Sequence, residues 1–200
     1  MAAVMWAPSG HNGAVADGFW FYAIVLGAAF AQVARDLALQ IRDTVRQSHR
    51  SIFWPTILWQ IFLLLLSVEV FIAVAAYTSE PQVRSVLNFM AFLAVPVGIF
   101  IASLLLEGGP EEALDPRHNF ARSRRVLFAI IVALPAINIA HELILGEAGL
   151  DGDLLFQALL IIGGTIGFFV RSTKADVTLA VAMNVVIAAY IGTMYSTVTF

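Results

Sequence analysis

One carboxylate interrupts the most apolar stretch of this 200-residue chain. In the segment LLLLSVEVFIAVAAY, residues 63–77, the only charged side chain is that of Glu69. A charged group near the centre of a bilayer costs roughly 2.5–3.5 kcal/mol on insertion scales, so such residues normally face a protein interior, a wet cavity or a partner chain. Glu69 is therefore the first candidate for proton or cation chemistry.

A second polar group lies in the segment PAINIAHELILGE, residues 135–147. Asn138 precedes His141 by three residues and Glu142 by four, and this spacing puts Asn138 on one helix face with both. At about 1.5 Å per residue along each predicted span, this group lies at a depth comparable to that of Glu69 and Asn88, in the outer half of the membrane. We therefore expect one outward-facing polar cluster of all five side chains.

Three chemical interpretations of this cluster remain open. In the first, Glu69 carries protons or binds a cation, with His141 as a relay. In the second, Glu69, His141 and Glu142 bind a divalent metal. The adjacent His141 and Glu142 lack the second histidine of an HExxH motif. In the third, the polar groups only hydrogen-bond the helices together, an effect of about 1 kcal/mol per contact.

Other polar and small residues are expected to join the helices. Isolated amides within a span are typical of interhelical hydrogen bonding. Three such amides are expected in the inner half of the membrane, together with one charged residue, Arg35. The amides are Gln32, Gln60 and Asn184. Gly163 and Gly167 form a small-xxx-small pair, which predicts a close approach of two helices.

The elements that position these residues are long apolar helices. The chain is 60% hydrophobic and 12% charged, whereas soluble domains carry about 25% charged residues. This composition predicts an all-α, polytopic membrane bundle, with residues 1–17 as a short extracytoplasmic tail and 18–200 as one domain. A membrane span needs roughly 20 apolar residues, and six stretches qualify: about 18–40, 53–77, 86–106, 125–145, 154–170 and 177–197.

The basic residues predict the orientation of the bundle. Ten of the eleven Lys and Arg residues fall on one side of the six expected spans, and only Arg84 falls on the other. Cytoplasmic loops carry such an excess, so both termini are expected outside. Tyr190 and Tyr195 then lie near the outer ends, as interfacial anchors do. Residues 107–125 are expected to form a turn-rich cytoplasmic loop.

Several function classes are excluded by composition and motifs. The chain has no cysteine, and we find no Ser–His–Asp arrangement, zincin motif, P-loop or haem-attachment motif. We therefore expect neither an enzyme nor a bound cofactor. The net charge is −3, and no basic stripe suits nucleic acid. The expected partners are membrane lipids, with anionic headgroups at Arg42, Arg46 and Arg50, and further copies of this chain or the subunits of a membrane complex.

Two segments carry a resemblance to a known family. FYAIVLGAAFAQVARDLALQIRD, residues 21–43, and FWPTILWQIFLLLLSVEVF, residues 53–71, resemble a family of small, uncharacterised six-helix proteins of the bacterial inner membrane. The resemblance implies the fold and the membrane, and no activity. Where that family tends to have Gln-Val-Gln, this chain has Ser67-Val68-Glu69, a departure that favours a hydrogen-bonding position facing a neighbour.

Together these patterns predict a multi-pass protein of the bacterial inner membrane. The first expectation is a protein that conducts or transports a proton or another small cation through the polar cluster around Glu69. The alternative is a non-catalytic structural or accessory subunit of a membrane complex. The two expectations differ in whether Glu69 supports flux or assembly.

Overall fold

The described part of the chain is entirely helical. The computed structural model describes residues 10–46, 53–77, 86–107, 116–145 and 152–195. These residues form six helices and no strand, which confirms the predicted all-α class. The helices are α1 (Gly10–Arg46), α2 (Trp54–Tyr77), α3 (Val86–Glu107), α4 (Pro116–Leu145), α5 (Gly152–Phe169) and α6 (Thr173–Met194).

Five of these helices are long and apolar enough to cross a membrane. Large apolar side chains such as Ile24, Leu155 and Val185 are largely exposed on their outward faces, as expected for a surface that meets hydrocarbon. The bundle therefore fits a multi-pass membrane protein. The qualifying segments are Trp20–Arg42, Trp54–Ala73, Arg117–Leu143, Gly152–Phe169 and Thr173–Met194, and the described apolar part of α3 is the shorter Leu93–Glu107.

Two helices extend beyond the predicted spans. Helix α1 begins at Gly10, within the stretch predicted as a tail, and continues to Arg46. The prediction of a loop over residues 107–125 was wrong from residue 116 onward, because α4 already begins at Pro116, and residues 108–115 lie outside the described part. Proline is favoured at the first position of a helix, where its missing N–H would have no partner in any case. The basic segment that follows is thus helical and carries Arg124 into the bundle.

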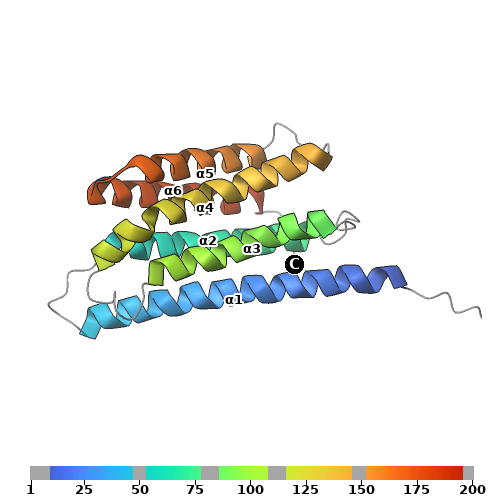
Figure 1. Cartoon of the computed structure of the whole chain (residues 1–200), viewed down its shortest axis with the longest axis horizontal. Helices are drawn as coiled ribbons and strands as arrows, with labels where there is room; N and C mark the ends of the chain where they lie inside the picture. Colours follow the sequence, from blue (N-terminus) through green and yellow to red (C-terminus); the bar gives the residue numbers. More distant parts are fainter. Residues whose placement is uncertain (1–9, 47–52, 78–85, 108–115, 146–151, 196–200) are drawn as a thin grey trace, which may run out of the picture.

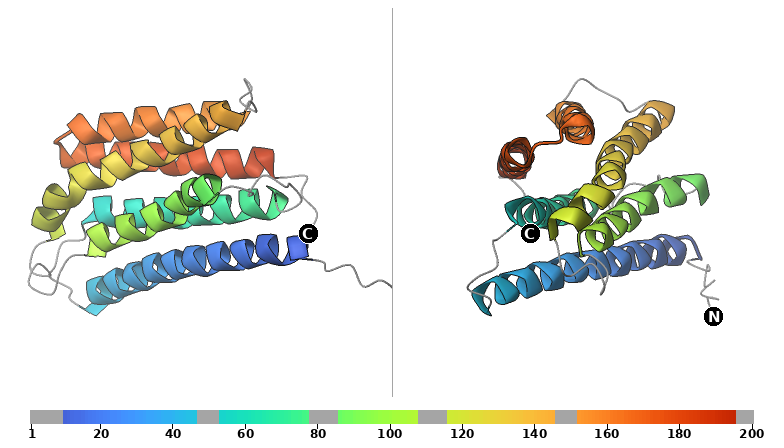
Figure 2. Two further views of the ribbon diagram at one scale, coloured as in Figure 1. Left: turned by 45° about the vertical axis from the view of Figure 1, so that its right-hand side comes forward. Right: turned by 60° about the vertical axis from the view of Figure 1, so that its left-hand side comes forward.

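The helices lie roughly along one axis in three layers (Figure 1). Helix α1 forms one side, α2 and α3 form the middle, and α4, α5 and α6 form the other side, as the turned views also show (Figure 2). Helix α1 packs on α2 and α3, while α4 packs on α3 and α6 packs on α2. Helix α5 completes the bundle by packing on α4 and α6.

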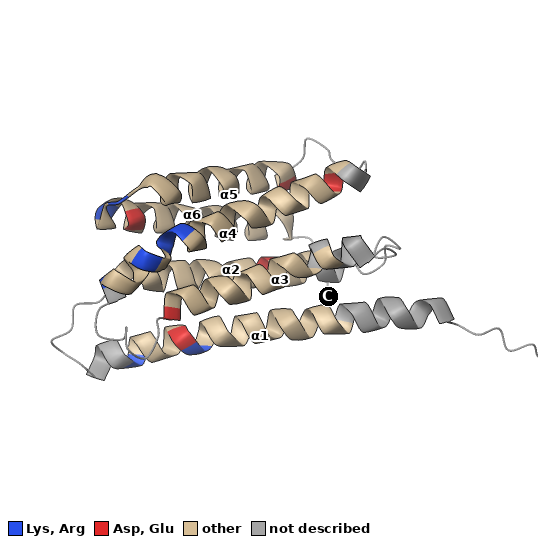
Figure 3. Ribbon diagram, viewed as in Figure 1, with Lys and Arg blue, Asp and Glu red and all other residues tan. Residues whose placement is uncertain are grey.

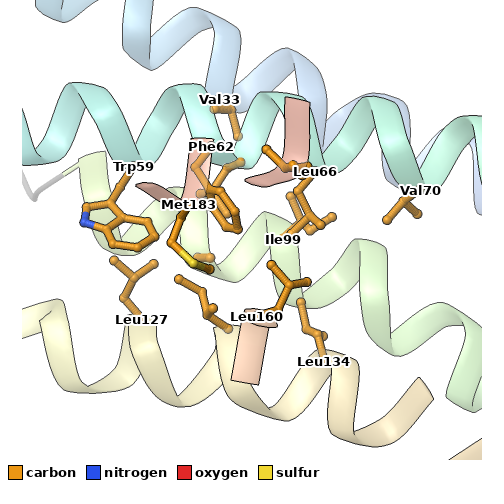
Figure 4. Close-up of a cluster of buried hydrophobic side chains, with 14 of the residues drawn as sticks. Val33, Trp59, Phe62, Leu66, Val70, Ile99, Leu127, Leu134, Leu160 and Met183 are labelled. Atoms are coloured by element: carbon orange, nitrogen blue, oxygen red, sulfur yellow. The ribbon is translucent and has the colours of Figure 1, made fainter. Parts of the chain in front are cut away.

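The middle of the bundle is an apolar core. Trp59 of α2 has no exposed surface and meets the rings of Phe62 and Phe128 edge-on, with centroids 5.4 and 5.0 Å apart. Figure 4 shows Trp59 beside Leu127 and Met183, with further apolar side chains extending along the bundle. This core separates the two ends of the molecule.

Three glycines bring α5 close to its neighbours. A Cβ atom at Gly163 would collide with Met183 of α6, and one at Gly167 would collide with the ring of Phe128 on α4. At Gly164 the obstacle would be Val132 of α4, at 2.8 Å. Small residues at such positions allow apolar helices to approach each other closely.

A buried ion pair joins the same three helices. Arg124 of α4 donates to Asp176 of α6 at 2.7 Å and to the backbone carbonyl of Gly167 on α5, at 2.7 Å from Nη2. Its guanidinium also lies 5.5 Å from the ring centroid of Phe128. The carbonyl of Gly167 is among the last four of α5, which have no partner within the helix, so Arg124 caps α5 while it binds α6.

We predict that Gly167→Ala destabilises the bundle, whereas Gly27→Ala does not. The ring of Phe128 is held between Gly167 and Trp59 and cannot withdraw, so overpacking should lower the free energy of unfolding by about 1–3 kcal/mol. A Cβ at Gly27 meets nothing within 4 Å, and alanine there should be neutral or stabilising by about 0.5–1 kcal/mol. The free energy of unfolding of both variants can be measured in mixed micelles. Equal values would contradict the predicted collision of the new Cβ atom with Phe128.

We also predict that Arg124→Leu is more harmful than the double variant Arg124→Leu/Asp176→Leu. The single change leaves the buried carboxylate of Asp176 without its partner, which typically costs about 3–5 kcal/mol. Replacing both groups removes the uncompensated charge, so the free energy of unfolding of the double variant should lie between those of the single variant and the wild type. The exposed neighbour Arg125 provides the control Arg125→Leu, for which we expect little change. A double variant as unstable as the single one would refute this account.

Candidate functional site

The candidate site is a group of hydrogen-bonded carboxylates at one end of the bundle. Figure 3 shows the described Lys and Arg residues gathered toward the opposite end. Acidic residues from three helices mark the site end: Glu69 of α2, Glu142 of α4 and Asp153 of α5. We call this set, with the side chains that bridge it, the acidic network.

The first half of the acidic network joins α4 to α5. Asn138 donates to Oε1 of Glu142 at 2.6 Å. The amide nitrogen of Gln157 donates to the same Oε1 at 3.1 Å and to Oδ2 of Asp153 at 2.8 Å. Two carboxylates on neighbouring helices therefore share one neutral donor. The spacing of four residues in Asn138–Glu142 and in Asp153–Gln157 brings each pair together on its own helix.

The second half of the acidic network runs through α6 to α2. Tyr190 donates to Oδ1 of Asp153 at 2.6 Å, and its ring stacks on Phe156 with a centroid separation of 4.0 Å. The ring of Tyr195 meets Tyr190 edge-on at 6.1 Å, and its hydroxyl donates to Oε1 of Glu69 at 3.4 Å. Polar groups from four helices thus follow one another from Asn138 to Glu69.

Glu69 is the most enclosed carboxylate of the network. Its residue is 7% exposed, and it interacts electrostatically with Asp153 of α5 and with Tyr22 of α1. Seven residues make nearly two full turns, so Glu69 shares a helix face with the fully buried Phe62. The same apolar periodicity that builds the core therefore turns Glu69 inward.

The structure brings together only part of the predicted cluster. Asn138 and Glu142 meet directly, whereas the described contacts join Glu69 to them through residues of α5, Tyr190 of α6 and Tyr195, which follows α6. His141 is half-buried, and its Nε2 has no hydrogen-bond partner among the described residues. Asn88 lies in α3, and its side chain falls outside the described part.

Four members of the network were missed from sequence: Asp153, Gln157, Tyr190 and Tyr195. A usable signal existed on α5, where Asp153 and Gln157 repeat the four-residue spacing of Asn138 and Glu142. The tyrosines carried no such signal, because tyrosine near a span end is also typical of an interfacial anchor.

The predicted inner residues are distributed over two interfaces. Gln32 of α1 donates to both carboxylate oxygens of Asp36, at 3.2 and 3.1 Å, and to Glu107 of α3 at 3.0 Å. Asn184 of α6 donates to the carbonyl of Leu58 on α2 at 3.0 Å, so it hydrogen-bonds two helices. Gln60 is fully buried, and neither of its amide atoms has a partner within the described chain.

The predicted lipid-contacting arginines are described only in part. Arg35 and Arg42 are exposed near the basic end of α1. The side chains of Arg46 and Arg50 lie outside the described residues. Contact of Arg42, Arg46 and Arg50 with anionic headgroups stays a prediction.

The metal interpretation finds no geometric support. Among the described residues, no group of three or more His, Asp and Glu side chains is placed to hold a metal ion. No protein-family model, curated protein or solved structure matches the chain. A function can therefore be inferred only from the side chains of the acidic network and not from a related protein.

We predict that Tyr190→Phe destabilises the protein more than Tyr195→Phe. Both changes keep the ring and remove one hydroxyl donor. Tyr190 holds Asp153 at 2.6 Å, whereas Tyr195 reaches Glu69 only at 3.4 Å. A hydrogen bond to a charged group contributes about 1.5–3 kcal/mol, so Tyr190→Phe should lower the unfolding free energy by an amount in this range. Equal stability of the two variants would show that the bond to Asp153 contributes little.

Proposed function

We propose that this chain is a six-span protein of the bacterial inner membrane that moves protons or another small cation through the acidic network around Glu69. The observation that carries the proposal is that three carboxylates accept hydrogen bonds from neutral donors within one network. Amides and tyrosine hydroxyls bridge them, and none of these groups bears a positive charge. Ionisable residues within membrane spans typically mark proton relays and ion pathways.

The charge distribution supports an orientation with both termini outside. The described Lys and Arg residues gather at one end of the bundle (Figure 3), and an excess of basic residues is typical of the cytoplasmic side. The acidic network then belongs to the outer half. Helix α3 contains 22 residues, and at 1.5 Å per residue this length matches the roughly 30 Å of a hydrocarbon core, so we count it as the sixth span.

The hydrogen bonding of Glu69 favours ion binding over a purely structural role. A network that only joined helices would be expected to surround each carboxylate with short donor contacts. Glu142 and Asp153 have such contacts, from Asn138 and Tyr190 at 2.6 Å, whereas the contact of Glu69 with Tyr195 spans 3.4 Å. With so long a contact, the carboxylate of Glu69 retains the capacity to accept a proton or a cation.

The apolar core supports the alternative of an accessory subunit. Trp59, Phe62 and Phe128 have no exposed surface and close the middle of the bundle between the acidic network and the basic end. In a structural subunit this core would stay closed, and the network would only hold α2, α4, α5 and α6 together. In a transporter the helices would move to admit the ion.

We predict that the purified protein, reconstituted in liposomes, supports a proton or cation flux that Glu69→Gln abolishes. Glutamine keeps the size and the hydrogen-bonding capacity of the side chain but cannot exchange a proton. Interior pH and cation indicators, with a valinomycin-set potential, measure the flux. The variant should match protein-free liposomes while its thermal stability and reconstitution yield stay unchanged.

Two results would contradict the transport proposal. Undiminished flux in Glu69→Gln would remove Glu69 from the pathway. Flux absent from the wild type as well, together with a stable assembly that Glu69→Gln weakens, would favour the accessory subunit.

A further inference from the structure

The least explained side chain in the described structure is that of Gln60. It is fully buried in α2, and both its amide nitrogen and its amide oxygen lack hydrogen-bond partners among the described residues. Leaving a buried polar group unsatisfied costs about 1–3 kcal/mol, and buried polar groups in folded proteins are paired with protein or with ordered water. The environment of Gln60 must therefore supply a partner that is not a described protein group.

Gln60 belongs to a polar row on one face of α2. Thr56, Gln60 and Ser67 are all buried, and at 100° per residue their spacings of four and seven keep them within a narrow arc. Ser67 lines an apolar groove together with Leu26 and Gly27 of α1. The polar row therefore faces α1.

The register of the two helices places Gln60 near Asp36. Helices α1 and α2 run in opposite directions (Figure 1), and the groove brings the part of α1 around Leu26 to about the depth of Ser67 on α2. Val33 lies seven residues from Leu26 toward the basic end, and Gln60 lies seven residues from Ser67 in the same direction. Each step is about 10 Å along the helix axis, so Val33 and Gln60 lie at about the same depth. Asp36 lies one helical turn beyond Val33 on the same face, at a depth between Gln60 and Thr56.

Asp36 connects this position to the surface of the basic end. Asp36 is 2% exposed and accepts hydrogen bonds from Gln32, which also donates to Glu107. Glu107 is exposed at the end of α3, and the adjacent Arg35 is exposed on α1. Hydrophilic side chains thus continue from the basic surface to the depth of Gln60.

We propose that a route for water opens at the basic end between α1, α2 and α3, passes Asp36 and Thr56, and ends at the amide of Gln60, all three of which are closed off from solvent in the described arrangement. Water supplies the hydrogen bonds that the amide lacks, and both the amide and the carboxylate of Asp36 suit an internal water site with several polar partners. This inference rests on the proposed transport function for its role, in which the passage is the inner access route for the transported ion. The water itself can be tested without any flux.

The chain has no cysteine, so a single introduced thiol reports water access directly. We would place Gln60→Cys, Thr56→Cys, Leu127→Cys and Lys174→Cys one at a time in the full chain, in sealed membrane vesicles of both orientations. The probe is a small, membrane-impermeant, cationic methanethiosulfonate, and intact-mass spectrometry counts the labelled molecules. Lys174 is exposed at the basic end and marks that side, whereas Leu127 is fully buried beside Trp59 (Figure 4) and serves as the dry control.

We expect Gln60→Cys and Thr56→Cys to be labelled from the same side as Lys174→Cys, while Leu127→Cys stays unlabelled. If Gln60→Cys remains unlabelled in folded protein, or reacts only from the opposite side, the passage does not exist. Should Gln60→Cys fail to fold, Thr56→Cys decides, because Thr56 lies on the route and a small residue replaces a small one; its lack of labelling would overturn the proposal.

The labelling separates this inference from the proposed function. Labelling at Gln60 in a protein without flux would establish the passage and refute transport. Flux without labelling would retain transport and refute the passage.

Discussion

The position of Arg124 constrains the whole second half of the bundle. Its guanidinium is buried, and a buried cation must be paired because its desolvation is so unfavourable. The pair with Asp176 places the first turn of α6, and the bond to the carbonyl of Gly167 places the last turn of α5. Both contacts also suit the helix dipoles, since a cation lies at the C-terminus of α5 and an anion at the N-terminus of α6. Phe128, one turn beyond Arg124, then fills the space that Gly167 leaves open.

That constraint determines where the acidic network can form. Helices α4, α5 and α6 are joined at the basic end by Arg124 and along their length by the glycines of α5. Their other ends therefore bring Glu142, Asp153 and Tyr190 together. Hydrocarbon provides no alternative partners for these groups, so the network closes upon itself and reaches Glu69 through Tyr195. The apolar core between the two ends keeps the acidic network apart from the basic residues.

The sequence was sufficient for the helices and for part of the site. Solid apolar runs predicted α2, α5 and α6 to within a few residues, because a span of hydrocarbon imposes both length and composition. The beginning of α4 was missed because residues 116–124 are polar and show no apolar run. Their helix is stabilised by a tertiary contact, the burial of Arg124 against α5 and α6. Asn138 and Glu142 were predicted together because their contact is local. The connections through Asp153, Gln157, Tyr190 and Tyr195 depend on which helices are neighbours, and one sequence does not contain that order.

Helix α2 is the wall that the two polar regions share. Glu69 and Gln60 are nine residues apart, which is half a turn out of phase, so Glu69 faces α6 while Gln60 faces α1. An ion that used both regions would have to pass from one face of α2 to the other, across the level where Phe62 and Leu63 are buried. In a transporter this apolar layer would have to open during the transport cycle, as alternating access of a site to the two sides requires. The same layer in a fixed bundle would make α2 a purely structural partition, so the mobility of α2 distinguishes the two functions.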